Sequence, residues 1–78
     1  MQLTKHEREA KRLVRGLMAS QDISYKELAR RLESYGIELD SKALSTKINR
    51  GKFPLSFFLA CLEAMHIDTR IDRLFTRE

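Results

Sequence analysis

Apolar residues recur at intervals of three and four along this chain, and no segment alternates apolar with polar residues at a period of two. The first spacing places side chains on one face of an α-helix, whereas alternation would place them on one face of a strand. The 78 residues leave room for one domain, because a second fold needs about another 50 to 100. The sequence therefore predicts a single all-α domain over residues 1–78.

The clearest helix boundary in the chain lies at residues 23–28. Ser24 and Glu27 have the spacing of a capping box, in which each side chain binds a backbone N–H group of the first turn. Ile23 and Leu28 occupy the flanking positions of a hydrophobic staple. Thr4 and Glu7 have the same spacing at the start of the first helix, and Asp40 or Ser41 can cap the third. Gly36 and Gly51 are expected to end the second and third helices, and Pro54 suits the first turn of the fourth. The five expected helices span residues 4–20, 24–35, 41–50, 54–65 and 69–76.

The same spacing predicts which side chains face the core. The short third helix should turn Leu44 and Ile48 inward. The larger inward sets are Ala10, Leu13, Val14, Leu17 and Met18 in the first helix, Leu28, Ala29 and Leu32 in the second, Leu55, Phe58, Leu59, Leu62 and Met65 in the fourth, and Ile67, Ile71, Leu74 and Phe75 at the fifth.

The fourth expected helix is apolar on nearly every side, with Glu63 as its one charged residue. Phe57, Ala60 and Ala64 lie away from its expected inward face, so they either pack beneath the fifth helix or form an exposed patch. An exposed patch, joined by Phe75, would predict a homodimer. The alternative places the fourth helix at the centre of the monomer core.

The charges give a second line of evidence. Lys and Arg total 15, Asp and Glu total 11, and the net charge of +4 favours an anionic partner. Five cations of the first helix lie within about 120° of one another, opposite its apolar face: Lys5, Arg8, Lys11, Arg12 and Arg15. Such a basic stripe is either a site for a polyanion, which would relieve the repulsion between like charges, or a solvated face partly neutralised by Glu7 and Glu9.

The third expected helix combines positive charge with hydrogen-bonding side chains. Residues 42–52 hold four cations and no acid. With the apolar residues turned inward, the outward side chains are Lys42, Thr46, Asn49 and Arg50, with Ser45 at the margin. Arg and Lys donate to guanine, Asn can pair with adenine, and Thr offers a hydroxyl and a methyl group. These types predict a helix that reads base edges; the alternative is a solvated helix, although such a helix more often carries glutamates as well.

Catalytic and metal chemistry find little support in the sequence. Cys61 and His66 are the only candidates for a nucleophile and a base, yet five helical residues place them about 140° apart. The two histidines are far apart in the chain, and Cys61 is the only cysteine, so a metal site lacks ligands. We therefore expect no enzyme activity, no metal or other cofactor, and no small-molecule substrate.

Membrane association is also not expected. No apolar run approaches the roughly 18 residues of a membrane span, and the first residues lack the apolar segment of a signal peptide. The first helix could lie on a membrane surface, but its apolar face lacks large aromatic residues, which favours a partner in the protein core. These features predict a cytoplasmic protein.

The order of these pieces resembles the helix-turn-helix family of phage Cro and CI repressors. The match runs through Ser24–Leu32, Ile48–Pro54, Ala64–Ile67 and Leu74–Phe75. In that family five short helices pack around one core, and the second and third form the DNA-binding unit. The resemblance implies base or groove contacts by Lys42, Ser45, Thr46, Asn49 and Arg50. With the basic stripe included, the expected phosphate contacts are Arg8, Arg12, Arg15, Ser24, Tyr25, Lys26, Lys47 and Lys52.

One departure from the repressors lies between Leu32 and Ile48, where the chain is longer than is typical. The added residues, 33–40, could lengthen the second helix and change the angle at which the third meets DNA. The extended turn and the run Lys47–Pro54 look more like a small uncharacterised bacterial domain family, domain of unknown function 6471. That second resemblance implies no activity.

Together these features predict sequence-specific binding of double-stranded DNA by a small bacterial or phage transcriptional regulator, associated with the nucleoid, with the third helix in the major groove. A homodimer on a palindromic site would strengthen the limited affinity of one short helix. The alternative is a protein-interaction module, such as an adaptor, antitoxin or anti-activator, that uses the apolar outer side of the fourth and fifth helices.

Overall fold

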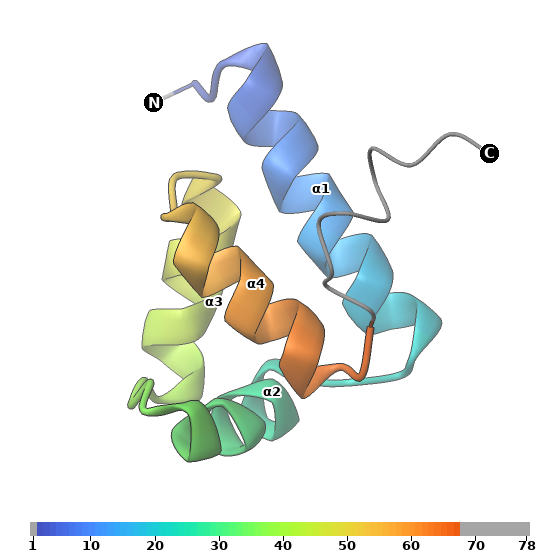
Figure 1. Cartoon of the computed structure of the whole chain (residues 1–78). Helices are drawn as coiled ribbons and strands as arrows, with labels where there is room; N and C mark the ends of the chain where they lie inside the picture. Colours follow the sequence, from blue (N-terminus) through green and yellow to red (C-terminus); the bar gives the residue numbers. More distant parts are fainter. Residues whose placement is uncertain (1, 68–78) are drawn as a thin grey trace, which may run out of the picture.

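The computed structural model describes residues 2–67 and shows four α-helices and no strand within them (Figure 1). They are α1 (Lys5–Ser20), α2 (Tyr25–Leu32), α3 (Ser41–Arg50) and α4 (Leu55–Ala64), with a 3-10 turn, η1 (Glu33–Tyr35), after α2. The prediction of an all-α fold is confirmed for these residues. The expected fifth helix, residues 69–76, lies outside them. None of the four helices is long and apolar enough to cross a membrane.

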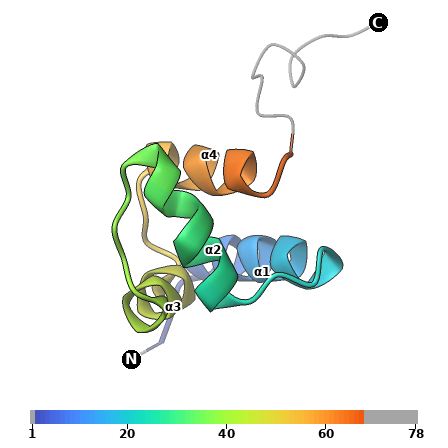
Figure 2. The ribbon, with the colours of Figure 1, turned by 90° about the horizontal axis from the view of Figure 1, so that it is seen from below.

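The helices contact one another in the order α1, α3, α2 and α4. α1 packs against α3, and α2 packs against both α3 and α4. In the view from below, α2 lies between α4 on one side and α1 with α3 on the other (Figure 2). This arrangement leaves one side of α3 uncovered by any other described helix.

Each of the first three helices begins with a side chain that binds a backbone N–H group. Thr4 and Glu7 form the expected capping box, with Thr4 Oγ1 accepting from Glu7 N at 3.1 Å and Glu7 Oε1 accepting from Thr4 N at 2.9 Å. Asp40 Oδ1 accepts from Ala43 N at 2.7 Å, and α3 has the predicted bounds. Ser24 caps α2 as expected, but the Glu27 carboxylate binds Arg30 and Arg31 instead of completing a capping box.

Four helical segments end at a residue with a left-handed backbone, and one of these residues is Gly51 after α3, with a φ value of 67°. The other three share one hydrogen-bond pattern. Asp22, Gly36 and His66 have φ values of 56°, 81° and 62°. At each position the N–H group binds a carbonyl three residues back, and the next N–H group binds a carbonyl five residues back. This is the Schellman arrangement, in which glycine is favoured. Of these three residues only Gly36 could be expected from the sequence, because the Cβ of Asp or His disfavours a left-handed backbone.

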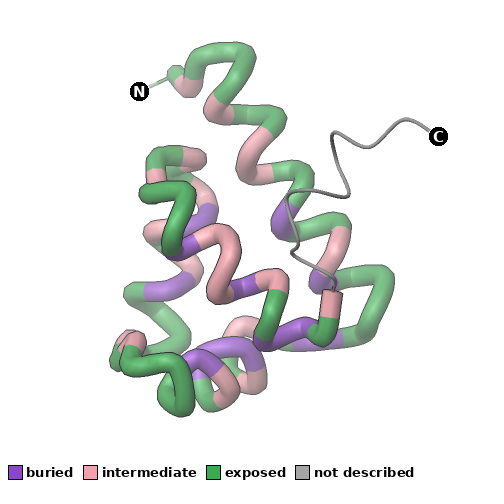
Figure 3. Tube along the Cα trace, viewed as in Figure 1, coloured by how far each residue is buried: buried purple, intermediate pink, exposed green. Residues whose placement is uncertain are grey.

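The hydrophobic core draws side chains from all four helices (Figure 3). The expected inward residues of α2 and α3 are all buried, as are Val14 and Met18 of α1 and Met65 after α4. The complete set of buried hydrophobic residues is Val14, Met18, Ile23, Leu28, Ala29, Leu32, Leu44, Ile48, Phe57, Cys61, Ala64 and Met65.

The predicted inward face of α4 was wrong in part, because Met65 is the one member of the five that is buried. Leu55, expected inside, is 64% exposed, whereas Phe57 and Ala64, expected on the outer side, are 6% and 3% exposed. A helix that is apolar on nearly every side gives no periodic signal for the buried face, so the packing against α2 decides it. The prediction for Leu13 of α1 was wrong as well, since this side chain is 52% exposed.

The expected dimer patch of Phe57, Ala60, Ala64 and Phe75 is therefore not present as predicted. Phe57 and Ala64 are core residues, and Ala60 is partly buried against the core. They are therefore not available as a surface. Phe75, the fourth member, lies outside the described residues.

Candidate nucleic-acid interface

The outer side of α3 faces solvent because two side chains fix the rotation of the helix. Leu44 and Ile48 are both 0% exposed, and the opposite side carries Lys42, Thr46 and Arg50, which are exposed. We call these last three residues the α3 ridge. They follow one another at intervals of four residues, so they form one row along the helix.

Asn49 lies at the edge of the α3 ridge, where it is partly buried and bonded to three other residues. Its Nδ2 donates to the Ser45 carbonyl oxygen at 2.8 Å, to Ser45 Oγ at 3.1 Å and to the Tyr25 hydroxyl at 3.3 Å. Its Oδ1 accepts from Arg15 Nη1 at 3.4 Å. Asn49 thus connects α1, α2 and α3. The sequence predicted base contacts for Asn49 and Ser45, but the structure engages both in bonds within the protein.

This network was not found from the sequence. One part of it had a local signal, because an Asn inside a helix can bind the carbonyl four residues back, which here is that of Ser45. The bond to Arg15 spans 34 residues of sequence and the bond to Tyr25 spans 24. A helical wheel shows only the neighbours on one helix, so neither partner could be predicted.

Arg15 brings the basic stripe of α1 beside α3. Arg8, Arg12 and Arg15 are exposed, as is Lys5, while Lys11 is partly buried. Because Arg15 reaches Asn49, the side of α1 that bears the stripe borders the α3 ridge. Two basic surfaces that are separate in sequence therefore adjoin one another in the fold.

The first turn of α2 lies next to the same network. Ser24 and Lys26 are exposed, and the partly buried Tyr25 holds its hydroxyl against Asn49. The first N–H groups of a helix are favourable for an anion. The three expected phosphate contacts of α2 therefore lie close to α3.

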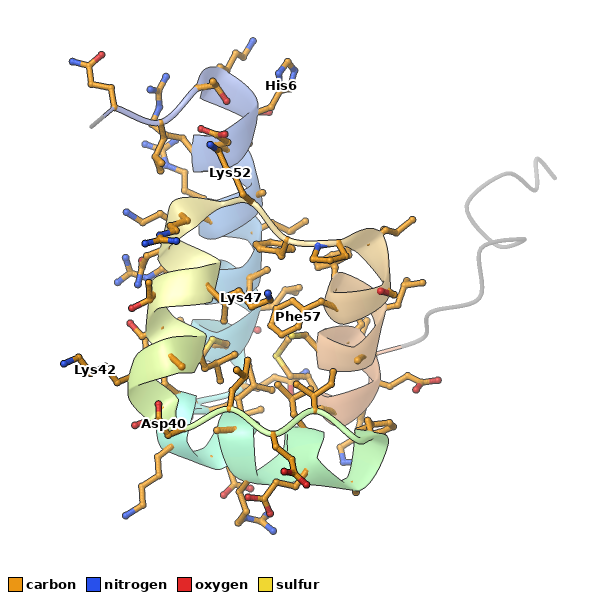
Figure 4. The ribbon with its side chains drawn as sticks, turned by 90° about the vertical axis from the view of Figure 1, so that its left-hand side faces the viewer. His6, Asp40, Lys42, Lys47, Lys52 and Phe57 are labelled. Atoms are coloured by element: carbon orange, nitrogen blue, oxygen red, sulfur yellow. The ribbon has the colours of Figure 1, made fainter. Side chains whose placement is uncertain are left out.

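Lys47 lies beside the α3 ridge, on the side toward α4. Its Nζ lies 5.3 Å from the centre of the Phe57 ring, a cation–π contact with α4. Figure 4 shows Lys47 directed toward Phe57 while Lys42 points away from α4. The side chain is partly buried, so the geometry does not favour the phosphate contact predicted for Lys47.

Lys52 follows the C-terminal end of α3 and is paired within the protein. Its Nζ is 3.5 Å from Glu7 Oε2. The pKa of Glu7 is lowered, first by its hydrogen bond from the Thr4 backbone and then by the charge of Lys52. A phosphate contact by Lys52 would therefore compete with an existing ion pair.

A shallow hollow of about 520 Å³ runs along the outside of α3. Four of its eight lining residues are cations and one is an acid: Leu39, Asp40, Lys42, Ala43, Thr46, Lys47, Arg50 and Lys52. The one acid, Asp40, is held by its hydrogen bond to the Ala43 N–H group. The hollow therefore offers a cationic surface to an approaching anion.

The residues considered for catalysis lie elsewhere. Cys61 is 0% exposed, and burial raises the pKa of its thiol to about 11, so the reactive thiolate is disfavoured. His66 is exposed at the left-handed end of α4. Among the described residues, no group of three or more His, Cys, Asp or Glu side chains could hold a metal ion.

The described residues thus form a small all-α protein with one helix face lined by cations and bordered by a basic stripe. Residues 6–70 match a protein family described as Domain of unknown function (DUF6471), and the chain belongs to this family. No curated protein and no solved structure matches the chain.

Proposed function

We propose that this protein binds double-stranded DNA as a small transcriptional regulator, with α3 in the major groove and α2 and α3 acting as a helix-turn-helix unit with an extended turn. The observation that carries the proposal is the α3 ridge, an exposed row of Lys42, Thr46 and Arg50. No acid lies on this helix within residues 41–50. An α-helix fits the major groove of B-form DNA.

The chemistry of the ridge suits base edges. Arg50 and Lys42 carry donors for guanine O6 and N7, and Thr46 offers a hydroxyl and a methyl group. All three are exposed, so the folded protein does not need to rearrange to present them. This is the reason to prefer α3 over any other described helix as the reading element.

Phosphate contacts would come from the neighbouring surfaces. Arg8, Arg12 and Arg15 lie on the side of α1 that borders α3. Such contacts fix the orientation of a protein on the duplex without reading its sequence. These exposed arginine side chains can follow a phosphate backbone along the side of the ridge that faces α1.

A titration of mixed-sequence duplex DNA at two salt concentrations tests this proposal. If about six phosphates are neutralised, the slope of log affinity against log salt should be near −5, and a rise from about 50 to 200 mM salt should weaken binding about 10³-fold. Ser56→Ala, on exposed α4 surface, serves as the control and should match the parent protein. Affinity that does not change with salt would reject DNA binding.

The protein-interaction alternative has an observation of its own. A hollow of about 220 Å³ between α1 and the start of α4 is lined only by apolar or aromatic residues, Ala10, Leu13, Phe53, Leu55 and Phe58. Leu13 and Leu55 are more than half exposed. If this surface carries the function, Leu13→Gln and Leu55→Gln should abolish capture of a protein partner, whereas Lys42→Gln and Arg50→Gln should be tolerated.

A further inference from the structure

We infer that sequence discrimination belongs to the α3 ridge alone, and that Asn49 is a positioning residue that holds Arg15 and Tyr25 beside the ridge. This inference rests on the proposed DNA binding. It divides the outward residues of α3 into two groups. Lys42, Thr46 and Arg50 read bases, while Asn49 and Ser45 hold α3 against α1 and α2.

Asn49 is unsuited to base reading because its amide is already occupied. To pair with adenine, an Asn side chain must present both its N–H donors and its carbonyl acceptor to one base. Here Nδ2 is within 2.8–3.3 Å of acceptors on Ser45 and Tyr25, and Oδ1 accepts from Arg15. Turning the amide toward DNA would break these bonds and leave partly buried groups without partners, which opposes the gain from a new base contact.

The side chains of the α3 ridge, unlike that of Asn49, are free of such contacts in the described part of the chain. Lys42, Thr46 and Arg50 are exposed. Among residues 2–67 their side chains take part in none of the ion pairs, which involve Glu7, Glu27, Arg30, Arg31 and Lys52. New contacts to base edges therefore displace only water.

The spacing of the ridge indicates the kind of DNA site. Residues four apart on a helix are separated by about 6 Å along its axis, so Lys42 and Arg50 are about 12 Å apart along α3. Base pairs are stacked about 3.4 Å apart, so this length matches about three to four base-pair steps. We expect two guanines at this separation, contacted by Lys42 and Arg50, with a thymine methyl group between them against Thr46.

Asn49 would act through the residues that it holds. Arg15 lies in the basic stripe, and Tyr25 lies at the first turn of α2. Both are positioned for phosphates, whose contacts carry no sequence information. Loss of the Asn49 amide should therefore weaken binding to every duplex by a similar factor and leave the preferred sequence unchanged.

The test is selection of binding sites from a random-sequence duplex pool by the full chain, followed by titration of the selected site and a scrambled site. Four variants are compared with the parent: Arg50→Gln, Asn49→Ala, Tyr25→Phe and the surface control Ser56→Ala. Arg50→Gln should lose the guanine preference at one position and bind the selected site about 5- to 150-fold more weakly. Asn49→Ala should select the parent sequence and lose similar factors on both sites.

Tyr25→Phe tests the same contact by a smaller change, in case the Asn49→Ala variant does not fold. It removes only the hydroxyl that Asn49 Nδ2 contacts, and we expect it to keep the parent sequence preference with uniformly weaker binding. A changed base preference in Asn49→Ala or Tyr25→Phe, or an unchanged preference in Arg50→Gln, would overturn the inference while leaving DNA binding intact. If the parent protein enriches no sequence and shows no salt-dependent binding, the proposed function and this inference both fail.

Discussion

Gly51 lies so close to the backbone of Glu7 that a Cβ atom at position 51 would overlap the Glu7 carbonyl oxygen. This approach joins the end of α3 to the first turn of α1. The Lys52 to Glu7 ion pair lies at the same junction. The junction links the basic stripe to the α3 ridge, so the proposed interface depends on a glycine that belongs to neither of these two surfaces.

Gly51→Ala should therefore be much more destabilising than Gly36→Ala. Both glycines have left-handed backbones, with φ values of 67° and 81°, and a Cβ in that conformation costs about 1–2 kcal/mol. The space beside Gly36 is open, so only this conformational cost applies there. At position 51 overpacking adds about 1–3 kcal/mol. Urea unfolding of both variants measures the difference, and equal losses would show that the contact with Glu7 is relaxed in solution.

Replacement of His66 by glycine should stabilise the fold. His66 has a φ value of 62° at the end of α4, and glycine adopts this conformation without strain. After allowance for the greater freedom of glycine in the unfolded chain, we expect His66→Gly to raise the free energy of unfolding by about 0.5–1 kcal/mol. Gln21→Gly is the control, because Gln21 has a φ value of −108°, and it should give no gain. A loss of stability in His66→Gly would contradict the backbone described for α4.

The Glu27 carboxylate should make the stability of the fold depend on pH. Hydrogen bonds from Arg30 and Arg31 lower its pKa from 4.5 to about 2. Arg31 also donates to the Ala64 carbonyl oxygen at 3.0 Å, which ties this group to the end of α4. Since the folded pKa is the lower one, the ionised group stabilises the fold above pH 4.5, and this contribution is lost as the pH falls toward about 2.

Thermal melts of the parent and Glu27→Gln between pH 6 and pH 2 check this expectation. The parent should be the more stable protein at the upper end of the range, and the difference should shrink steadily below pH 4.5. A difference that stays constant across the range would mean that the ion pairs do not form in solution.

Lys42 and Lys47 provide a matched test on one helix, because substitution of either by Gln removes one positive charge. Lys42→Gln should weaken binding to the selected site about 5- to 150-fold and relax the guanine preference at one position, as expected of a residue that reads a base. Lys47→Gln should have little effect on binding but should lower stability by about 0.5–1 kcal/mol through loss of the contact with Phe57. If both variants weaken binding equally, the net charge of the protein determines its affinity for DNA and the ridge has no special role.

Local signals in the sequence predicted much of this fold. The bounds of α3 and the caps at Thr4, Ser24 and Asp40 follow from side chains that bind backbone groups within three residues. The buried pair Leu44 and Ile48 follows from helical spacing, because the rest of α3 is polar enough to leave one inward face. That pair is the reason the α3 ridge could be predicted.

The remaining features depend on contacts between helices. The buried face of α4 could not be predicted, because Leu55 and Phe57 are equally apolar and only packing against α2 distinguishes them. Lys47 was grouped with Lys42 by charge, yet its side chain is directed toward Phe57 of α4 and away from the proposed DNA surface. Asn49 was expected to reach solvent, and its partners on α1 and α2 are distant in sequence.

The most direct measurement is a map of backbone amide chemical shifts in the ¹⁵N-labelled protein during titration with a mixed-sequence DNA duplex at low salt. We predict that the largest changes fall on Lys42, Thr46 and Arg50, with smaller changes on the basic stripe of α1 and the first turn of α2. The amides of Ser56 and Glu63 on α4 should stay in place. Changes centred on Leu13 and Leu55, or no changes at all, would contradict the account.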